Sequence, residues 1–197
     1  SIHQNYDLLV EFDVQIVGET KLRVVHNLIA NRTTKLSDIR RIYAHPQAAA
    51  QCERFLRQHP HWSVLHVYDT AGSVKMIKEE KALDAAAIAS SAAAKHFDME
   101  ILKEGIESDP QNYTRFIVIA REAPKGKSAR VDKVSVVYAT ENKPGALFRT
   151  LEVFARRGVN LCRLGSRPIP GKPFEYLFYV DLTGDVHDKN VAAALKE

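Results

Sequence analysis

The sequence predicts two consecutive domains, an α/β domain followed by a smaller ferredoxin-like β-α-β-β-α unit. Strand and helix patterns alternate up to about residue 120, which is typical of a largely parallel or mixed sheet covered by helices. After residue 130 the order is a strand, a helix, two strands joined by a short turn, and a helix, as in a ferredoxin-like unit without its last strand. The basic segment PKGKSARVDK at 124–133 separates the two halves.

The elements of the first domain follow from hydrophobic periodicity and from residues that begin or end helices. β-branched residues predict a strand over 14–30 with a break at Gly18. Pro46 predicts the start of a helix that extends to residue 59, because proline in the first turn forfeits only an N–H that lacks a helical partner. The other expected elements are strands at 39–44 and 62–68, a helix at 72–81, a strand and an alanine-rich helix within 84–97, and an extended segment at 99–106.

The last strand of this domain, FIVIA at 116–120, is apolar on both faces. Two apolar faces are typical of a central strand with helices on each side of the sheet. Ligands of open α/β sheets collect at strand ends, so the preceding Thr114 and Arg115 are candidate site residues. Neighbouring strand residues face opposite ways, so only one of the two readily faces a site.

The second domain has equally clear limits. A strand is predicted at 131–140, and Pro144-Gly145 begins a helix that Gly158 ends. Two further strands, at 159–168 and 174–184, are joined by the turn IPGKP, and a second helix is expected at 187–197.

Composition and charge favour an ordinary globular protein. The 197 residues are 45% hydrophobic and 26% charged, with a net charge of +4, and no run approaches the roughly 18 apolar residues of a membrane span. The N-terminus SIHQNYDLL has no signal-peptide pattern. The basic linker lacks interleaved aromatic residues, so it predicts a solvated segment rather than a nucleic-acid surface. Cys52 and Cys162 are far apart without a CxxC, and we expect two buried, reduced thiols of a cytosolic protein.

Common catalytic motifs are missing from the sequence. There is no GxGxxG, HExxH or GxSxG, and no His/Cys cluster has metal-ligand spacing. Gly126-Lys127-Ser128 is similar to the end of a P-loop, but Arg121 stands at the place of the first glycine. The sequence therefore predicts either chemistry that needs no metal, nucleotide or nucleophile, or ligand binding alone.

Five segments, taken in chain order, match one known family. NYTRFIVIAR at 112–121 contains a Thr-Arg-Phe motif, and YAHPQAAAQC at 43–52 is similar to a Ser-His-Pro-Gln segment that ends in a glutamine at Gln51. DTAGSVKMI at 69–77 and AAIASSAAAKHF at 86–97 are similar to a loop and an alanine-rich helix of the second lobe. NKPGALFRTLEVFARRGVNLCRLGSRP at 142–168 is similar to a regulatory ACT domain. The chain thus resembles the prephenate dehydratases over essentially its whole length.

The resemblance implies a periplasmic-binding-protein-like catalytic lobe followed by a ferredoxin-like ACT domain. It places the catalytic domain at 1–124 with its first lobe mostly absent, the linker at 125–130, and the ACT domain at 131–197 without its last strand. On this interpretation the chain is a fragment trimmed at both ends, and it is expected to be inactive alone because the active site lies between two lobes.

The activity implied is the conversion of prephenate to phenylpyruvate, with loss of water and carbon dioxide and without a cofactor. The resemblance also implies regulation by L-phenylalanine, a homodimer or homotetramer formed through the ACT domains, a cytoplasmic location, and neither nucleic-acid nor membrane partners. Two alternatives stay open: an arogenate dehydratase, and a non-catalytic sensor of aromatic amino acids.

The resemblance carries roles over to individual residues of the catalytic domain. Thr114 is expected to donate a hydrogen bond to the departing hydroxyl, with a backbone-satisfied strand threonine as the alternative. Gln51 is expected to donate to a substrate carboxylate, or else to be an exposed helix glutamine. Thr70 is a further catalytic candidate at a helix N-terminus that suits an anion, or an ordinary N-cap. Arg115 and His45 are substrate-binding candidates, although we favour an ion pair for Arg115 and a helix-entry role for His45.

In the ACT domain, the free N–H groups at the start of the predicted helix suit an amino-acid carboxylate, and apolar side chains nearby suit an aromatic ring. The alternative is a glycine needed only for a tight turn. The expected effector-binding residues are Asn142, Pro144, Gly145, Ala146, Leu147, Phe148, Gly165, Ser166 and Arg167.

Two residues depart from the family pattern. Ala44 stands where the family has a serine before His-Pro-Gln, so that hydroxyl is either dispensable or a helix cap whose loss costs about 1 kcal/mol. Gly165 stands where the family has a glutamate, and the missing carboxylate weakens the case that this position binds the ammonium group of the effector.

Overall fold

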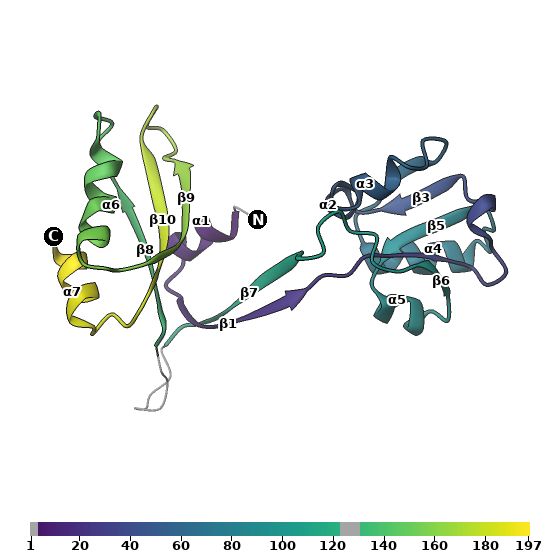
Figure 1. Ribbon diagram of the computed structural model, residues 1–197, viewed down its shortest axis with the longest axis horizontal. Coiled ribbons are helices and arrows are strands. Elements are labelled where there is room, and N and C mark those ends of the chain that lie inside the picture. The colour runs from purple at the N-terminus through teal and green to yellow at the C-terminus, as the bar shows by residue number, and fades with distance from the viewer. Residues whose placement is uncertain (1–3, 123–130) are drawn as a thin grey trace. The chain divides into compact units, whose positions relative to one another are not determined.

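The computed structural model describes residues 4–122 and 131–197 (Figure 1). The chain divides into two compact units: one is Glu19–Phe116, and the other combines the residues up to Gly18 with those from Ile117 onward. The predicted linker at 125–130 lies outside the described residues.

The Glu19–Phe116 unit is built on a five-stranded sheet in the order β4-β3-β5-β2-β6. Strand β3 is parallel to β4 and β5, whereas β2 is antiparallel to β5 and β6. This mixed sheet confirms the α/β prediction. The strands are β2 (Asn27–Ala30), β3 (Arg41–Ala44), β4 (Ser63–His66), β5 (Ala85–Ala89) and β6 (Glu100–Lys103), with a short 3-10 helix at Leu36–Asp38.

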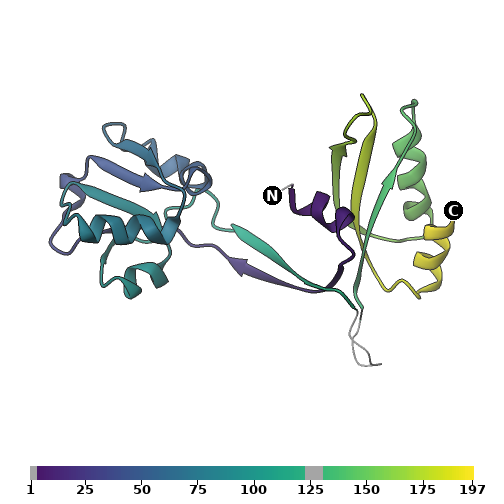
Figure 2. The same ribbon diagram turned by 180° about the vertical axis from the view of Figure 1, so that it is seen from behind.

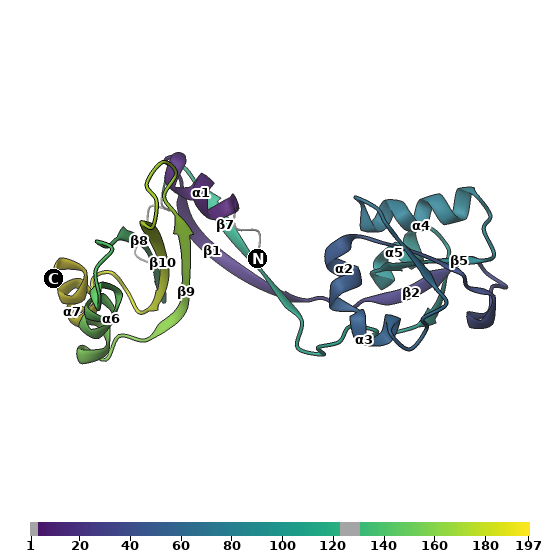
Figure 3. The ribbon, with the colours of Figure 1, turned by 90° about the horizontal axis from the view of Figure 1, so that it is seen from above.

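Helices cover both faces of this sheet. Helices α2 (Pro46–Gln51) and α3 (Glu53–Leu56) pack on one face, and α4 (Thr70–Glu79) and α5 (Ser91–His96) pack on the other (Figure 3). The single helix expected over 46–59 is therefore two helices. Cys52 separates them because its backbone leaves helical geometry, with φ −103° and ψ 14°.

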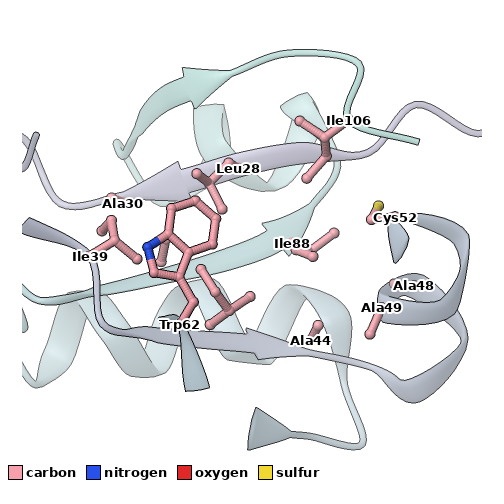
Figure 4. Close-up of a cluster of buried hydrophobic side chains, with 12 residues drawn as sticks. Leu28, Ala30, Ile39, Ala44, Ala48, Ala49, Cys52, Trp62, Ile88 and Ile106 are labelled. Atoms are coloured by element: carbon pink, nitrogen blue, oxygen red, sulfur yellow. The ribbon is translucent and has the colours of Figure 1, made fainter. Parts of the chain in front are cut away.

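Alternation along the strands divides the core in two, because successive strand residues point to opposite faces. Leu28, Ile42 and Ile88 pack with Trp62 and helix α2, as Figure 4 shows for most of this cluster. On the other face, the three remaining alanines of β5 (all but Ala86) pack with Ile29 and the apolar side chains of α4 and α5. The core side chains Leu28, Ile29, Ile42 and Ile88 are fully buried.

The segment 14–30 forms two strands in different sheets, β1 (Gln15–Arg23) and β2. The predicted break at Gly18 is wrong, because Gly18 lies within β1 and the break falls at 24–26. Hydrogen bonds explain this position. Val24 N–H donates to the Asn112 carbonyl at 2.8 Å, and the His26 carbonyl accepts from Ile106 N–H at 2.9 Å.

Strand β7 (Tyr113–Ala120) pairs with β1 in a two-stranded sheet. The prediction of a central strand covered on both sides is therefore wrong: Phe116, Val118 and Ile119 are 50–52% exposed. An apolar pattern reports which faces a strand can bury. It does not report how many strands pair with it.

The other unit contains β8 (Lys133–Ala139), α6 (Ala146–Arg156), β9 (Leu161–Pro168), β10 (Tyr176–Thr183) and α7 (Lys189–Lys196). This order confirms the ferredoxin-like prediction, with an antiparallel sheet in the order β8-β10-β9. Helices α6 and α7 cover one face around Phe154, Val180 and Leu182 (Figure 2). Helix α1 (Gln4–Glu11) is tied to β9 by an ion pair between Asp7 and Arg167.

The two cysteines have different environments. Cys52 is fully buried, as predicted, but Cys162 is exposed. The prediction for Cys162 is wrong because this residue lies where the β9–β10 register shifts, between the pairs Arg163–Asp181 and Leu161–Leu182. An extra residue at a bulge has no partner opposite it.

This difference predicts selective labelling. Burial, reinforced by the nearby charge of Glu107, raises the pKa of Cys52 to about 12, and only the thiolate is a good nucleophile. We expect iodoacetamide at pH 8 to modify Cys162 and leave Cys52 intact in the folded chain, and to modify both in denaturant. Peptide mass spectrometry measures both sites, and equal labelling of the folded chain would contradict this assignment.

Candidate functional site

The carboxyl edge of the five-stranded sheet collects the ends of several elements. Parallel strands β3, β4 and β5 end there, and helices α2, α4 and α5 begin shortly after them. Antiparallel β2 begins at the same edge, because Asn27 pairs with Ala89 at the end of β5. Ligands of open α/β sheets bind at this edge.

No helix among residues 4–122 and 131–197 has the length and apolar character needed to cross a membrane.

Gln51, at the end of α2, is the best-connected predicted residue at this edge. Its Oε1 lies 2.7 Å from Nε2 of His26, and its Nε2 donates to Oδ1 of Asn112 at 3.5 Å. Its backbone carbonyl accepts from Ser108 N–H at 2.7 Å. Gln51 is half-buried, so it is not the exposed helix glutamine that was the alternative.

A buried carboxylate supports this group. The Glu107 side chain is only 3% exposed, lies 3.8 Å from the Arg23 guanidinium, and accepts a hydrogen bond from His26 N–H at 3.0 Å. A buried charge is tolerated where it is paired and hydrogen-bonded. Glu107 therefore holds the loop that follows β6 against the start of β2.

Thr114 and Arg115 have different partners, as alternation along β7 predicts. Arg115 forms an ion pair with Glu19, with 2.5 Å between Nε and Oε2, and both side chains are about three-quarters buried. This confirms the ion pair that we favoured for Arg115. Thr114 is half-buried, and its hydroxyl makes no hydrogen bond with the residues that the structure describes. The fold leaves that hydroxyl available.

Thr70 and His45 lie at helix starts. Asp69, rather than Thr70, caps α4 by accepting from Ala71 N–H at 3.0 Å, so the N-cap alternative for Thr70 is wrong. A carboxylate of the chain already occupies this helix N-terminus, which leaves Thr70 a candidate through its hydroxyl. His45 caps α2, with Nδ1 accepting from Gln47 N–H at 3.2 Å, and this confirms its helix-entry role.

The cap at His45 also bears on Ala44. Ala44 is the last residue of β3 and is fully buried, and the residue that caps α2 is the next one along the chain. A serine at position 44 would not be the N-cap of this helix, so the capping explanation for the family hydroxyl is wrong here.

The two predicted effector segments meet at one end of the three-stranded sheet. Leu177 of β10 pairs with Ala139, the last residue of β8, and on its other side with Arg167 of β9. The segment from Asn142 to Phe148 directly follows β8 and therefore lies at the same end as Gly165–Arg167. Gly145 has φ +77° and is the N-cap of α6, which explains the need for glycine at this position.

The second effector segment divides between the faces of the sheet. Ser166 pairs with Phe178, on the face of Val180 and helix α6, whereas Arg167 is on the opposite face. There its guanidinium binds both oxygens of Asp7, at 2.6 and 3.3 Å. Asp7 raises the pKa of Arg167, and burial together with Asp7 raises the pKa of the Tyr179 hydroxyl. Arg167 is thus engaged by helix α1.

Sequence reasoning missed four of these residues: His26, Glu107, Asn112 and Asp7. His26 interrupts the apolar segment VVHNLIA, and Asn112 lies two residues before Thr114; both signals were visible. Glu107 and Asp7 belong to no recognisable motif, and only the tertiary contacts distinguish them. No group of three metal-ligating side chains is found in the described part of the chain.

Comparisons with known proteins agree on one family. The family model of prephenate dehydratase matches residues 1–124, and that of the ACT domain matches residues 134–197. The chain is 43% identical over 207 aligned positions to "Arogenate dehydratase/prephenate dehydratase 2, chloroplastic" of Arabidopsis thaliana, covering all of this chain and 54% of that protein. The chain spans about half the length of the curated relatives that it matches.

Solved structures show the same similarity. A prephenate dehydratase from Arthrobacter aurescens in complex with L-Phe has 35% identity and a TM-score of 0.79, over 93% of this chain and 61% of that one. A structure described as "a novel type of quorum quenching acylases" has 33% identity and a TM-score of 0.80, over 100% of this chain and 70% of that one. These relatives also share the fold class that the sequence predicted.

Proposed function

The chain belongs to the prephenate dehydratase family, and from this we propose that the protein converts prephenate to phenylpyruvate and responds to L-phenylalanine. In this reaction the ring C–O bond to the hydroxyl breaks, and so does the C–C bond to the ring carboxylate. The electron pair of the C–C bond enters the ring, which becomes aromatic, and carbon dioxide leaves. The departing hydroxide takes up one proton and leaves as water.

The chain offers groups for each part of this step. The Thr114 hydroxyl, which the described fold leaves available, donates a hydrogen bond to the departing oxygen and stabilises its charge. The Gln51 amide donates to a substrate carboxylate. Thr70 adds a second hydroxyl from the start of α4, at the carboxyl edge of the sheet. His45 and Arg115 have an indirect role in this proposal. His45 fixes the start of α2, and Arg115 fixes strand β7 through its ion pair with Glu19.

One contact carries this proposal. The Gln51 Nε2 to Asn112 Oδ1 hydrogen bond joins two motif segments that are 61 residues apart. It holds the start of the Thr-Arg-Phe strand beside the end of the His-Pro-Gln helix. Gln51 of one segment and Asn112 of the other therefore lie side by side, which supports a shared substrate site.

The direct test is an assay of the full-length protein with prephenate and with arogenate, following the aromatic product by absorbance. Turnover of prephenate supports the proposal, and a preference for arogenate selects the close alternative that the Arabidopsis thaliana relative's name includes. A protein that turns over neither substrate but binds L-phenylalanine in calorimetry would instead be a non-catalytic sensor.

L-phenylalanine is proposed as the effector of the ACT domain. The observation behind it is that the 142–148 and 165–167 segments meet at one end of the sheet. Phe148 there is 67% exposed, so it is available to a ligand ring or to a second ACT domain in a homodimer or homotetramer. We also propose that the protein is cytoplasmic.

The similarity to an acylase is a weaker basis for function. An acylase that uses a hydroxyl nucleophile needs a base within hydrogen-bond reach of it. Within the described residues, the Thr114 hydroxyl has no such partner. The groups at this site fit hydrogen-bond donation to a leaving oxygen better than nucleophilic attack.

A further inference from the structure

Three polar side chains of the Glu19–Phe116 unit form a hydrogen-bonded chain, His26–Gln51–Asn112. The proposed mechanism uses only its middle member. His26 is 7% exposed, and the other two are half-buried. Each hydrogen bond in this chain restricts the rotation of the side chains that it joins, although the Nδ2 of Asn112 is buried without a partner among the described residues.

The first outer member, His26, is fixed through its backbone. Its N–H donates to Glu107 Oε2 at 3.0 Å, and its carbonyl accepts from Ile106 N–H at 2.9 Å. The two bonds hold residue 26 between β1 and β2, so the position of the imidazole is set before it contacts Gln51.

The second outer member, Asn112, is fixed in the same way. Its N–H donates to the Asp109 carbonyl at 3.2 Å, and its own carbonyl accepts from Val24 N–H at 2.8 Å. These bonds fix the backbone from which its Oδ1 accepts from the Gln51 amide at 3.5 Å.

Gln51 lies between these two anchors. A glutamine amide rotates easily about its last torsion, and it has one acceptor oxygen and two N–H donors. His26 engages the oxygen and Asn112 engages one donor. Among the described residues, the second N–H has no partner, and its direction is set by the other two bonds.

We propose that His26 is a positioning residue, with Asn112 as the second anchor: together they aim the remaining Gln51 N–H at a carboxylate of the substrate. His26 does this as a donor, with its proton on Nε2 facing Gln51 Oε1. The inference rests on the proposed function, since it takes the substrate to be a cyclohexadienol that carries a ring carboxylate, such as prephenate or arogenate.

The test is a double-mutant cycle in the full-length protein, measured as kcat and KM for prephenate. His26→Leu is expected to lower kcat/KM about 10- to 100-fold, by analogy with the loss on removing a residue that orients a metal ligand. His26→Gln, which keeps an N–H donor near the place of Nε2, is expected to recover most of this loss. In a Gln51→Leu background, His26→Leu is expected to have no further effect, because its only route to the substrate is gone.

The matched control is His96→Leu, at an exposed histidine at the end of α5, which should leave kcat and KM unchanged. A second measurement does not depend on turnover. Long-range proton–nitrogen NMR of the wild-type protein should show His26 protonated at Nε2, with Nδ1 bare.

The possible outcomes separate the two proposals. Equal losses from His26→Leu in the wild-type and Gln51→Leu backgrounds would overturn the inference, because they would show a purely structural role. A His26 ring protonated only at Nδ1 would overturn it as well. A wild-type protein with the expected tautomer but no turnover of either substrate would contradict the proposed function, and with it the catalytic purpose assigned to His26.

Discussion

Replacing Thr114 by valine is expected to lower kcat for prephenate by about 10²- to 10³-fold, the usual loss when one donor to a developing oxyanion is removed. Valine keeps the β-branched shape that suits strand β7, so the change removes the hydroxyl and little else. Because the described fold makes no use of that hydroxyl, the free energy of unfolding should hardly change. Steady-state kinetics and thermal melting of the full-length protein measure the two effects separately.

Two further variants sharpen this test. Thr114→Ser restores a hydroxyl and should recover most of kcat. Thr20→Val makes the same substitution at an exposed residue of the partner strand β1 and should leave kcat unchanged. Full activity in Thr114→Val, or an equal loss in Thr20→Val, would remove Thr114 from the catalytic assignment.

Replacing Gly145 by alanine is expected to raise the L-phenylalanine concentration for half-maximal response at least about tenfold. Gly145 has φ +77°, and an added Cβ would lie 3.1 Å from Nη1 of Arg149. A side chain in the left-handed region costs about 1–2 kcal/mol, and about 1.4 kcal/mol corresponds to a factor of ten in affinity. In the proposed complex the free N–H groups of α6 face the effector carboxylate, and a shift of the N-terminus of α6 that relieves this strain would turn them away from it.

The matched control is Gly158→Ala at the other end of α6. Gly158 has φ +65° and no atom within 4 Å of an added Cβ. Its substitution therefore has a similar backbone cost but does not touch the effector segment. Calorimetry with L-phenylalanine and the activity response are measured for both variants. Equal shifts in the two would mean that loss of stability, rather than the effector site, explains the result.

The sequence was most informative where the physics is local. Helix starts at Pro46 and Gly145 and the strand at 85–89 follow from proline geometry, a left-handed glycine and apolar runs. Each signal acts over a few residues, so it can be seen without the fold. From residue 14 onward the order of the main strands and helices was predicted for the same reason, whereas helix α1 (Gln4–Glu11) was not predicted.

Strand partners are not local, and here the prediction failed. The run at 116–120 has two apolar faces, yet β7 pairs with β1 alone in a two-stranded sheet, and β1 separates from β2 at 24–26 rather than at Gly18. Hydrogen bonds from Val24 to Asn112 and from Ile106 to His26 decide that separation. Both join residues about 80 positions or more apart.

By itself, the sequence determined the family and the two domain types, and it indicated Gln51, Thr114 and Gly145 as candidate site residues, because short motifs and periodicity carry that information. Only the tertiary structure decided which side chains support them. His26 and Asn112 hold Gln51, Glu19 pairs with Arg115, and Asp7 engages Arg167. The physical reason is that a hydrogen bond or ion pair needs atoms within about 3 Å, and residues distant in the sequence reach that separation only through the packing of the sheet.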